Sequence, residues 1–173
     1  RFYTEEMHSR FQSLCDLHKD CVTLTHSEMS EEEKVQWFEQ LHLYVCASGA
    51  EGFSIPPREA MRLAIPVAVT DIPAHAELID SGFVHKIKPS SHTSQTQCDY
   101  HGGDVSVVEP TAVEEAIHTA LQNYTEVSIP NAMLAAKWCA YRWLPSDTEY
   151  QIVQHMKSVY YPKTKKTSLL KVS

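Results

Sequence analysis

Two short apolar runs with a helix-forming segment between them constrain the fold of this 173-residue chain most strongly. The runs are Leu43–Ala47 and Val67–Thr70, both of strand length. Continuous apolar runs of this kind are typical of strands buried on both faces, as in a parallel sheet covered by helices. Between them, Arg58–Leu63 consists of good helix formers, while Pro56 and Pro57 fit only the first turn of a helix. The segment therefore predicts a strand, loop, helix, strand unit of an α/β fold.

The residues before the first run predict a helix and then a short strand. Apolar residues recur with helical spacing near the start of the chain, at Met7, Phe11, Leu14 and Cys15. The following run, Cys21–Thr25, is rich in β-prone residues and predicts a strand.

A second helix is predicted directly before the run at 43–47. Ser30 and Glu33 have the spacing of a capping box, and the acidic residues of the first turn suit the positive end of a helix. This helix is expected to end near His42. Its apolar residues, expected to point inward, are Val35, Phe38 and Leu41.

The rest of the chain continues the alternation of helices and strands. The predicted elements are a short helix at Ala74–Ile79, a strand at Phe83–Ile87, a short strand at Val105–Val108, and helices at Val113–Tyr124, Asn131–Trp143 and Glu149–Tyr160. The polar stretch Pro89–Asp104 is long for a loop in a compact domain, so it is interpreted as an insertion or a mobile lid. The lysine-rich tail, residues 163–173, is expected to be disordered.

Composition excludes several classes of protein. The net charge of −7 has the wrong sign for binding nucleic acid through its phosphates, and no apolar run approaches the length of a membrane span. Five widely spaced cysteines without a C-x-x-C pair favour reduced thiols and a cytoplasmic location. The first residues show neither a starting Met nor the plan of a signal peptide, so the chain is expected to be the interior of a longer one.

The segment after the first run carries the residues with the clearest chemistry. In a parallel α/β sheet, ligands gather beyond the carboxyl ends of the strands, where Glu51 lies. The helix that begins near Ile55 directs its free N–H groups and its positive dipole end at this crevice, which favours phosphate. Gly52 permits close approach of the backbone, and Ser54 is expected to cap the helix. Glu59, one turn into the helix, is placed to accept hydrogen bonds from sugar hydroxyls.

The run from Glu51 to Pro73, E-G-F-S-I-P-P-R-E-A-M-R-L-A-I-P-V-A-V-T-D-I-P, resembles the E-x7-E signature of retaining glycosyltransferases of the GT-B architecture. The resemblance implies that residues 1–162 form the C-terminal, donor-binding half of such an enzyme. This half is a Rossmann-like parallel sheet flanked by helices, here incomplete at its N-terminus.

The resemblance also assigns roles to residues. In the family, the first Glu, here Glu51, faces the transferred sugar, and the second, here Glu59, holds the nucleotide ribose. Backbone amides of Phe53, Ser54 and Ile55 meet the sugar and the diphosphate. The implied reaction transfers a sugar from a nucleoside-diphosphate sugar to an acceptor hydroxyl with retention, and needs neither a metal nor a further cofactor.

The chain departs from the family pattern at two positions and lacks two parts. Ser54 and Ala64 stand where family members usually have glycine. The Arg and Lys residues that neutralise the diphosphate, and the acceptor-binding half, lie outside this sequence, so the chain alone is expected to be a poor enzyme. Its partners would be an N-terminal half, in the same or another chain, and an acceptor that is a glycan, a lipid or a protein.

Several alternatives remain open at this level. The chain could instead be a non-catalytic nucleotide-sugar-binding or scaffold subunit that needs a separate acceptor-binding chain. Arg58 and Arg62 could reach a phosphate or face solvent, and Glu77 could be a helix cap, a structural partner or a ligand. Cys98 with His101 is a close pair with zinc-ligand character, but no second pair lies near it in the sequence.

Two further clusters have a structural and a functional interpretation. The aromatic-rich group Trp138, Cys139, Tyr141 and Trp143 suits core packing better than a stacking platform. The lysine tail could make peripheral contact with an anionic membrane or simply be solvated.

Overall fold

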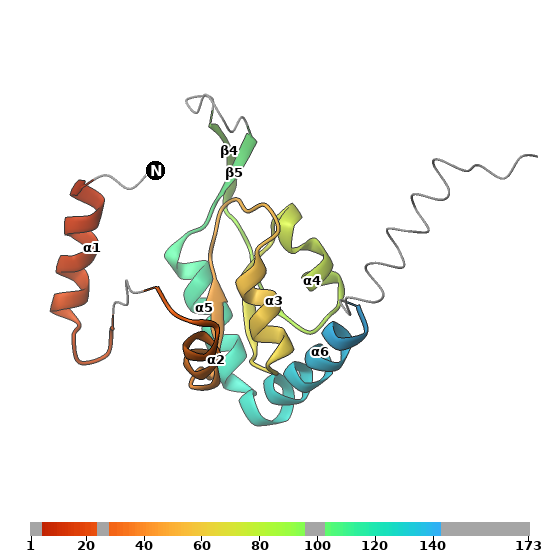
Figure 1. Cartoon of the computed structure of the whole chain (residues 1–173). Coiled ribbons are helices and arrows are strands. Elements are labelled where there is room, and N and C mark those ends of the chain that lie inside the picture. Colours follow the sequence, from red (N-terminus) through yellow and green to blue (C-terminus); the bar gives the residue numbers. More distant parts are fainter. Residues whose placement is uncertain (1–4, 24–27, 96–102, 143–173) are drawn as a thin grey trace, which may run out of the picture. The chain divides into compact units, whose positions relative to one another are not determined.

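A computed structural model of the chain describes residues 5–23, 28–95 and 103–142. The chain divides into two compact units, residues 1–36 and 37–173. The first holds helix α1 (Glu5–Leu17) and the start of helix α2 (Glu31–Glu39), and the second holds every strand found among the described residues (Figure 1).

The predicted capping box is present at the start of α2. The Ser30 backbone N–H donates to Glu33 Oε2 at 2.8 Å, and the Glu33 N–H donates to Ser30 Oγ at 3.2 Å. These reciprocal bonds satisfy two donors that the first turn of a helix would leave without partners. The helix ends at Glu39, a little before the predicted His42.

The strand predicted at Cys21–Thr25 is wrong for its first three residues. The N–H groups of Cys21 and Val22 both donate to the His18 carbonyl, at 2.9 and 2.8 Å, so the chain continues in a turn after α1. These local bonds occupy the donors that a strand would give to a neighbour. Residues 24 and 25 lie outside the described residues.

The inward face predicted for α2 is confirmed only in part. Phe38 is 3% exposed and belongs to the core of the second unit, against which Leu41 also packs. Val35 is 40% exposed and does not fit the predicted inward face.

The second unit is built on a parallel sheet, which confirms the α/β prediction. Its strand order is β1-β2-β3, with Tyr44 opposite Val67 and Ala68 opposite His85. The elements are β1 (Tyr44–Cys46), α3 (Ile55–Arg62), β2 (Val67–Thr70), the 3-10 turn η1 (Pro73–His75), α4 (Ala76–Asp80), β3 (His85–Ile87), α5 (Pro110–Gln122), the π-helical turn η2 (Tyr124–Ser128) and α6 (Ile129–Arg142). The helix predicted at 149–160 lies outside the described residues.

Helices cover both faces of this sheet. Alternate residues of β2 face opposite sides: Val67 and Val69 join a cluster with residues of α3, α4 and α6, while Ala68 joins a cluster with Ala116 of α5. All of β2 is buried, as a central strand requires. Strand β1, at the edge of the described sheet, is only half-buried, so burial on both faces was predicted too strongly for it. The resulting order of layers is helix, sheet, helix.

Helix α6 contributes part of this core. Trp138 packs against the larger cluster and Cys139 is buried, as predicted for core residues. Tyr141 is 77% exposed and is not a core residue. Trp143 lies outside the described residues.

A β-hairpin replaces much of the loop predicted at Pro89–Asp104. Strands β4 (Ser91–Gln95) and β5 (Gly103–Val107) pair in antiparallel fashion, with Ser91 opposite Val107. The sequence did not predict this hairpin, because its residues are polar. A two-stranded ribbon exposed to water lacks the apolar alternation of a half-buried strand. The strand predicted at Val105–Val108 is confirmed for its first three residues, since β5 ends at Val107. In Figure 1 the hairpin rises from the edge of the sheet at which the chain turns from β1 toward α3.

Helix α3 ends in a Schellman motif at Ala64. The Ile65 N–H donates to the Ala60 carbonyl at 3.0 Å, and the Ala64 N–H donates to the Met61 carbonyl at 3.1 Å. Ala64 has the left-handed φ of 58° that this motif requires. Glycine is the usual residue there because a Cβ is strained in this conformation.

Ala64→Gly is therefore expected to stabilise the chain by about 1 kcal/mol. The gain should appear in urea unfolding monitored by circular dichroism. Ala140→Gly is the matched control, since Ala140 is exposed within α6 and the change should cost about 0.5–1 kcal/mol there. Equal effects of the two substitutions would contradict the role of the left-handed φ.

Candidate functional site

The loop between β1 and α3 lies at the carboxyl end of β1, where ligands bind in parallel sheets. It contains Glu51, which is exposed and accepts a hydrogen bond from Ser48 Oγ at 2.6 Å. This bond holds the Glu51 carboxylate close to Ser48, two residues after the end of β1. Gly52 and Phe53 are also exposed in this loop.

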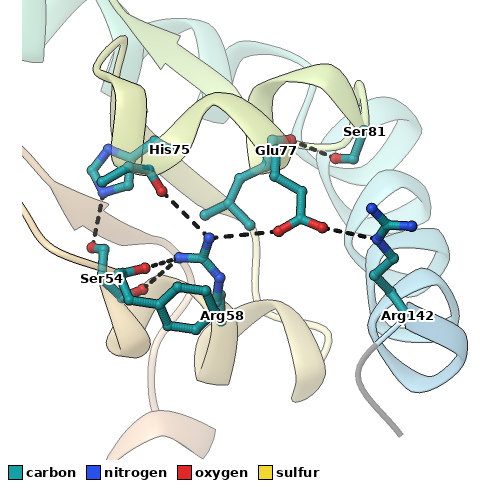
Figure 2. Close-up of polar contacts among 9 residues, drawn as sticks. Ser54, Arg58, His75, Glu77, Ser81 and Arg142 are labelled. Atoms are coloured by element: carbon teal, nitrogen blue, oxygen red, sulfur yellow. Dashed lines mark hydrogen bonds and ion pairs between the residues drawn. The ribbon is translucent and has the colours of Figure 1, made fainter. Parts of the chain in front are cut away.

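Ser54 does not cap α3 through its side chain, so that prediction is wrong. Its backbone is left-handed, with φ 57° and ψ 69°, and its hydroxyl forms no bond to the first turn. The hydroxyl instead lies 2.8 Å from His75 Nε2, as Figure 2 shows. Ser54 therefore fixes the loop to the 3-10 turn after β2.

His75 is completely buried and bonded through both ring nitrogens. Its Nδ1 lies 2.8 Å from the Thr70 carbonyl, while Nε2 contacts Ser54 and, at 4.0 Å, Cys46 Sγ. Burial alone would lower the pKa of His75, but the contacts with Cys46 and the Thr70 carbonyl outweigh it and raise the pKa. The contact with His75 lowers the pKa of the Cys46 thiol, against the effect of burial. A coupled polar cluster thus lies beneath the loop.

Arg58 neither reaches into the crevice nor faces solvent. It is 7% exposed, and its guanidinium donates to the carbonyls of Phe53, Ser54 (3.0 Å) and Ala74 (3.3 Å). The Phe53 ring covers it at 3.8 Å from its centroid. Arg58 therefore supports the loop from within, whereas Arg62 is exposed as one of its two interpretations expected.

Glu77 is a structural partner of two arginines. Its Oε1 accepts from Arg142 Nε at 2.8 Å, and its Oε2 lies 3.7 Å from Arg58 Nη2 (Figure 2). Burial lowers the pKa of Arg58, and the nearby carboxylate of Glu77 opposes this effect. The ion pairs connect α3, α4 and α6, so of the three interpretations of Glu77 the structural one holds.

Glu59 lies half-buried on α3, directly after Arg58. Its charge and that of Glu51 both act on the phenol of Tyr44, the pKa of which rises to about 12, mainly by burial and further through Cys46 and these two carboxylates. The two predicted donor-binding carboxylates thus influence the same part of the β1–α3 unit. Ile55, the first residue of α3, is 57% exposed.

Gly49 is a site residue that the sequence analysis did not single out. Its carbonyl accepts from the Ser106 N–H of β5 at 2.8 Å, and a Cβ on Gly49 would lie 2.2 Å from the Ser106 carbonyl oxygen. Only glycine permits this approach. The sequence offered one indication of this role, because Gly49 stands between the end of the predicted strand and Glu51.

A cavity of about 460 Å³ lies farther along the same edge of the sheet and was also missed. Its polar lining residues are Asp71, which follows β2, Lys88, which follows β3, and His92 of β4. The sequence could have indicated this cavity, because polar residues directly follow the strands there. In the described residues no group of three His, Cys, Asp or Glu side chains is placed to hold a metal ion, and the Cys98–His101 pair lies outside them.

The parallel sheet with helices on both faces is a Rossmann-like α/β unit, and the loop at the end of β1 lies at the sheet edge where such units bind ligands. The family model described as "Glycosyl transferases group 1" matches residues 4–123. The chain belongs to this family.

Two curated proteins show where the sequence is most similar. Over 46 residues the chain is 41% identical to the lipopolysaccharide core biosynthesis mannosyltransferase LpsB of Rhizobium meliloti, covering 27% of this chain and 13% of that protein. Over 84 residues it is 37% identical to the O-antigen chain mannosyltransferase RfbU of Salmonella typhimurium, covering 48% of this chain and 23% of that protein. The matched part is thus less than a quarter of each relative's length. Among the helices of the described residues, none has the length and apolar character needed to cross a membrane.

Proposed function

We propose that this chain supplies the donor-binding half of a glycosyltransferase that moves a sugar from a nucleoside-diphosphate sugar to an acceptor hydroxyl with retention of configuration. Family membership supports glycosyl transfer. The two relatives named above are mannosyltransferases, so a mannosyl donor is the first to test. The acceptor-binding half is provided by another part of the same protein or by a partner chain.

The observation that carries this proposal is how Arg58 orients the loop backbone. It binds the carbonyls of Phe53 and Ser54 from the inside. In a trans peptide the N–H points opposite to the carbonyl, so the N–H groups of Ser54 and Ile55 point away from Arg58. Ile55 is the first residue of α3, where backbone donors lack partners within the helix. These outward donors, together with the helix dipole, form a fixed site for the donor diphosphate.

The carboxylates complete the donor site in this proposal. Glu51 positions the transferred sugar, and Glu59 accepts hydrogen bonds from the ribose hydroxyls. Gly52 and Phe53 bring the backbone close to the sugar. The transition state is oxocarbenium-like, and the leaving phosphate, held beside the anomeric carbon, acts as the base for the incoming hydroxyl.

This chemistry requires no metal ion and no further cofactor in our proposal, because backbone donors and side chains stabilise the leaving group. We place the reaction in the cytoplasm, at the face of a membrane if the acceptor is a lipid. The free thiols of Cys15, Cys21, Cys46 and Cys139 support a reducing compartment.

Glu59→Ala is expected to weaken nucleoside diphosphate binding at least about tenfold, because charge-assisted hydrogen bonds to the ribose are lost. Calorimetric titration of the full chain with the diphosphates of each base measures this and identifies the base. Glu114→Ala is the matched control, since it removes an exposed carboxylate from α5 and should leave binding unchanged. Unchanged affinity in Glu59→Ala would refute the role of Glu59, and no binding of any diphosphate would refute the donor site on this chain.

A further inference from the structure

The cavity at the ends of β2 and β3 offers a second place for a ligand, separate from the β1–α3 loop. It is lined by Asp71, Ile72, Pro73, Ala76, Lys88, Pro89 and His92, with a volume of about 460 Å³. This volume lies within the range of small-molecule sites. Its position at the carboxyl edge of the parallel sheet is the usual one for ligand binding.

The polar groups of this cavity differ in whether they already have a partner. Asp71 Oδ2 forms an ion pair with Lys86 Nζ at 3.1 Å. Within the part of the chain that the structure describes, Lys88 forms no ion pair and His92 uses only Nδ1, at 2.9 Å from Ser106 Oγ. The lysine cation and His92 Nε2 therefore remain available to a ligand.

The remaining lining is apolar. Ile72 is buried beneath the cavity, and Pro73 and Pro89 contribute rigid hydrocarbon rings. Flat apolar patches of this kind suit the C–H face of a sugar ring, while an unpaired cation beside a hydrogen-bonding imidazole suits a negatively charged substituent. A ligand that matches both features is a sugar bearing an acidic group.

Ser106 connects this cavity to the loop at the end of β1. Its backbone N–H binds the Gly49 carbonyl at 2.8 Å, and its hydroxyl binds His92 at 2.9 Å. Pro73, in the cavity wall, is two residues from His75, which is bonded to Ser54 of the same loop. A sugar in the cavity would thus lie beside the proposed donor site, where an acceptor is needed.

We propose that this cavity binds an acidic sugar residue, with a carboxylate or a phosphate held by Lys88 and a ring hydroxyl held by His92. Its assignment to the acceptor rests on the proposed function above, whereas the binding itself does not. Asp71, which forms an ion pair with Lys86 at 3.1 Å, accepts a hydrogen bond from a further hydroxyl.

The test is a titration of the full chain with mannose 6-phosphate, glucuronate, neutral methyl mannoside and inorganic phosphate, followed by NMR. Either acidic sugar, or both, is expected to bind about tenfold more tightly than the neutral sugar and than inorganic phosphate. The stronger of the two identifies the acidic group. The proposal is overturned when neither acidic sugar binds more tightly than both the neutral sugar and inorganic phosphate.

Variants locate the ligand within the chain. Lys88→Ala is expected to weaken binding of the acidic sugar about tenfold. The matched control Lys137→Ala removes an exposed lysine of α6 and should leave binding unchanged. An undiminished affinity in Lys88→Ala overturns the proposal.

A third variant separates this cavity from the donor site. Glu59→Ala should leave acidic-sugar binding unchanged. Loss of acidic-sugar binding in this variant would assign the sugar to the donor site and overturn the proposal. The nucleoside diphosphate titration fails or succeeds independently, so the failure of one proposal is distinguishable from the failure of the other.

Discussion

Arg58→Met lowers the free energy of unfolding by about 3 kcal/mol, because it removes a buried cation whose hydrogen bonds hold three carbonyl oxygens. Methionine keeps most of the apolar volume of the side chain, so the loss reports on the guanidinium rather than on a cavity. Glu77 retains its bond to Arg142. Urea unfolding of the full chain, monitored by circular dichroism, provides the measurement.

The control for this substitution lies on the same helix. Arg62→Met makes the identical chemical change at an exposed position one turn later and should alter stability by no more than about 0.5 kcal/mol. Similar losses in the two variants would mean that the interactions of Arg58 with the loop contribute little. Arg58→Met should also weaken nucleoside diphosphate binding, since the peptide planes of the loop lose their support.

His75→Leu is expected to destabilise the chain by about 3 kcal/mol. The ring is completely buried, and its removal leaves the Ser54 hydroxyl and the Thr70 carbonyl without their 2.8 Å partner. Because Ser54 holds the loop to the 3-10 turn through this ring, the loop should also become more susceptible to limited proteolysis. His118→Leu, at an exposed position of α5, is the matched control.

The pH dependence of this effect is set by the raised pKa of His75. A group whose pKa is higher in the folded state binds its proton more tightly there, so its stabilisation is complete below the unfolded pKa of about 6.5 and is lost as the pH rises through the folded pKa. The difference in stability between the wild-type chain and His75→Leu should therefore be larger near pH 5.5 than near pH 7.5. A difference that grows with pH instead would mean that burial dominates and that His75 is neutral in the folded chain.

Local patterns predicted the sheet and the helix beside the site. The apolar run Val67–Thr70 is strand β2 with the same bounds, and the prolines at 56 and 57 lie in the first turn of α3 as expected. These elements are specified by nearby residues, so their own sequence suffices. The capping box at Ser30 is of the same kind.

Features that depend on distant partners were missed or mistaken. Cys21–Thr25 has strand propensity, but its first residues bond back to His18 in a turn. The hairpin β4–β5 is stabilised by pairing between its own strands and by the Gly49–Ser106 bond, and neither leaves an apolar pattern in the sequence.

The candidate site shows the same division. The segment from Glu51 to Glu59 was identified because its residue types and its position after a strand are local properties. The burial of Arg58 could not be predicted, since it depends on the Ala74 carbonyl and on Glu77, which come from later elements. Ser54 was expected to cap its own helix, but its hydroxyl is hydrogen-bonded to His75, 21 residues away in the sequence.

Helix α3 is enclosed between two left-handed residues, Ser54 and Ala64. Each of them reverses the chain at one end of the helix, so the eight residues Ile55–Arg62 form a segment of set length. An inserted or deleted residue would rotate the later turns of the helix by about 100° and turn Arg58 or Glu59 away from the loop. This segment can therefore accept substitutions during evolution far more readily than changes in length, and the separation of Glu51 from Glu59 has a mechanical cause.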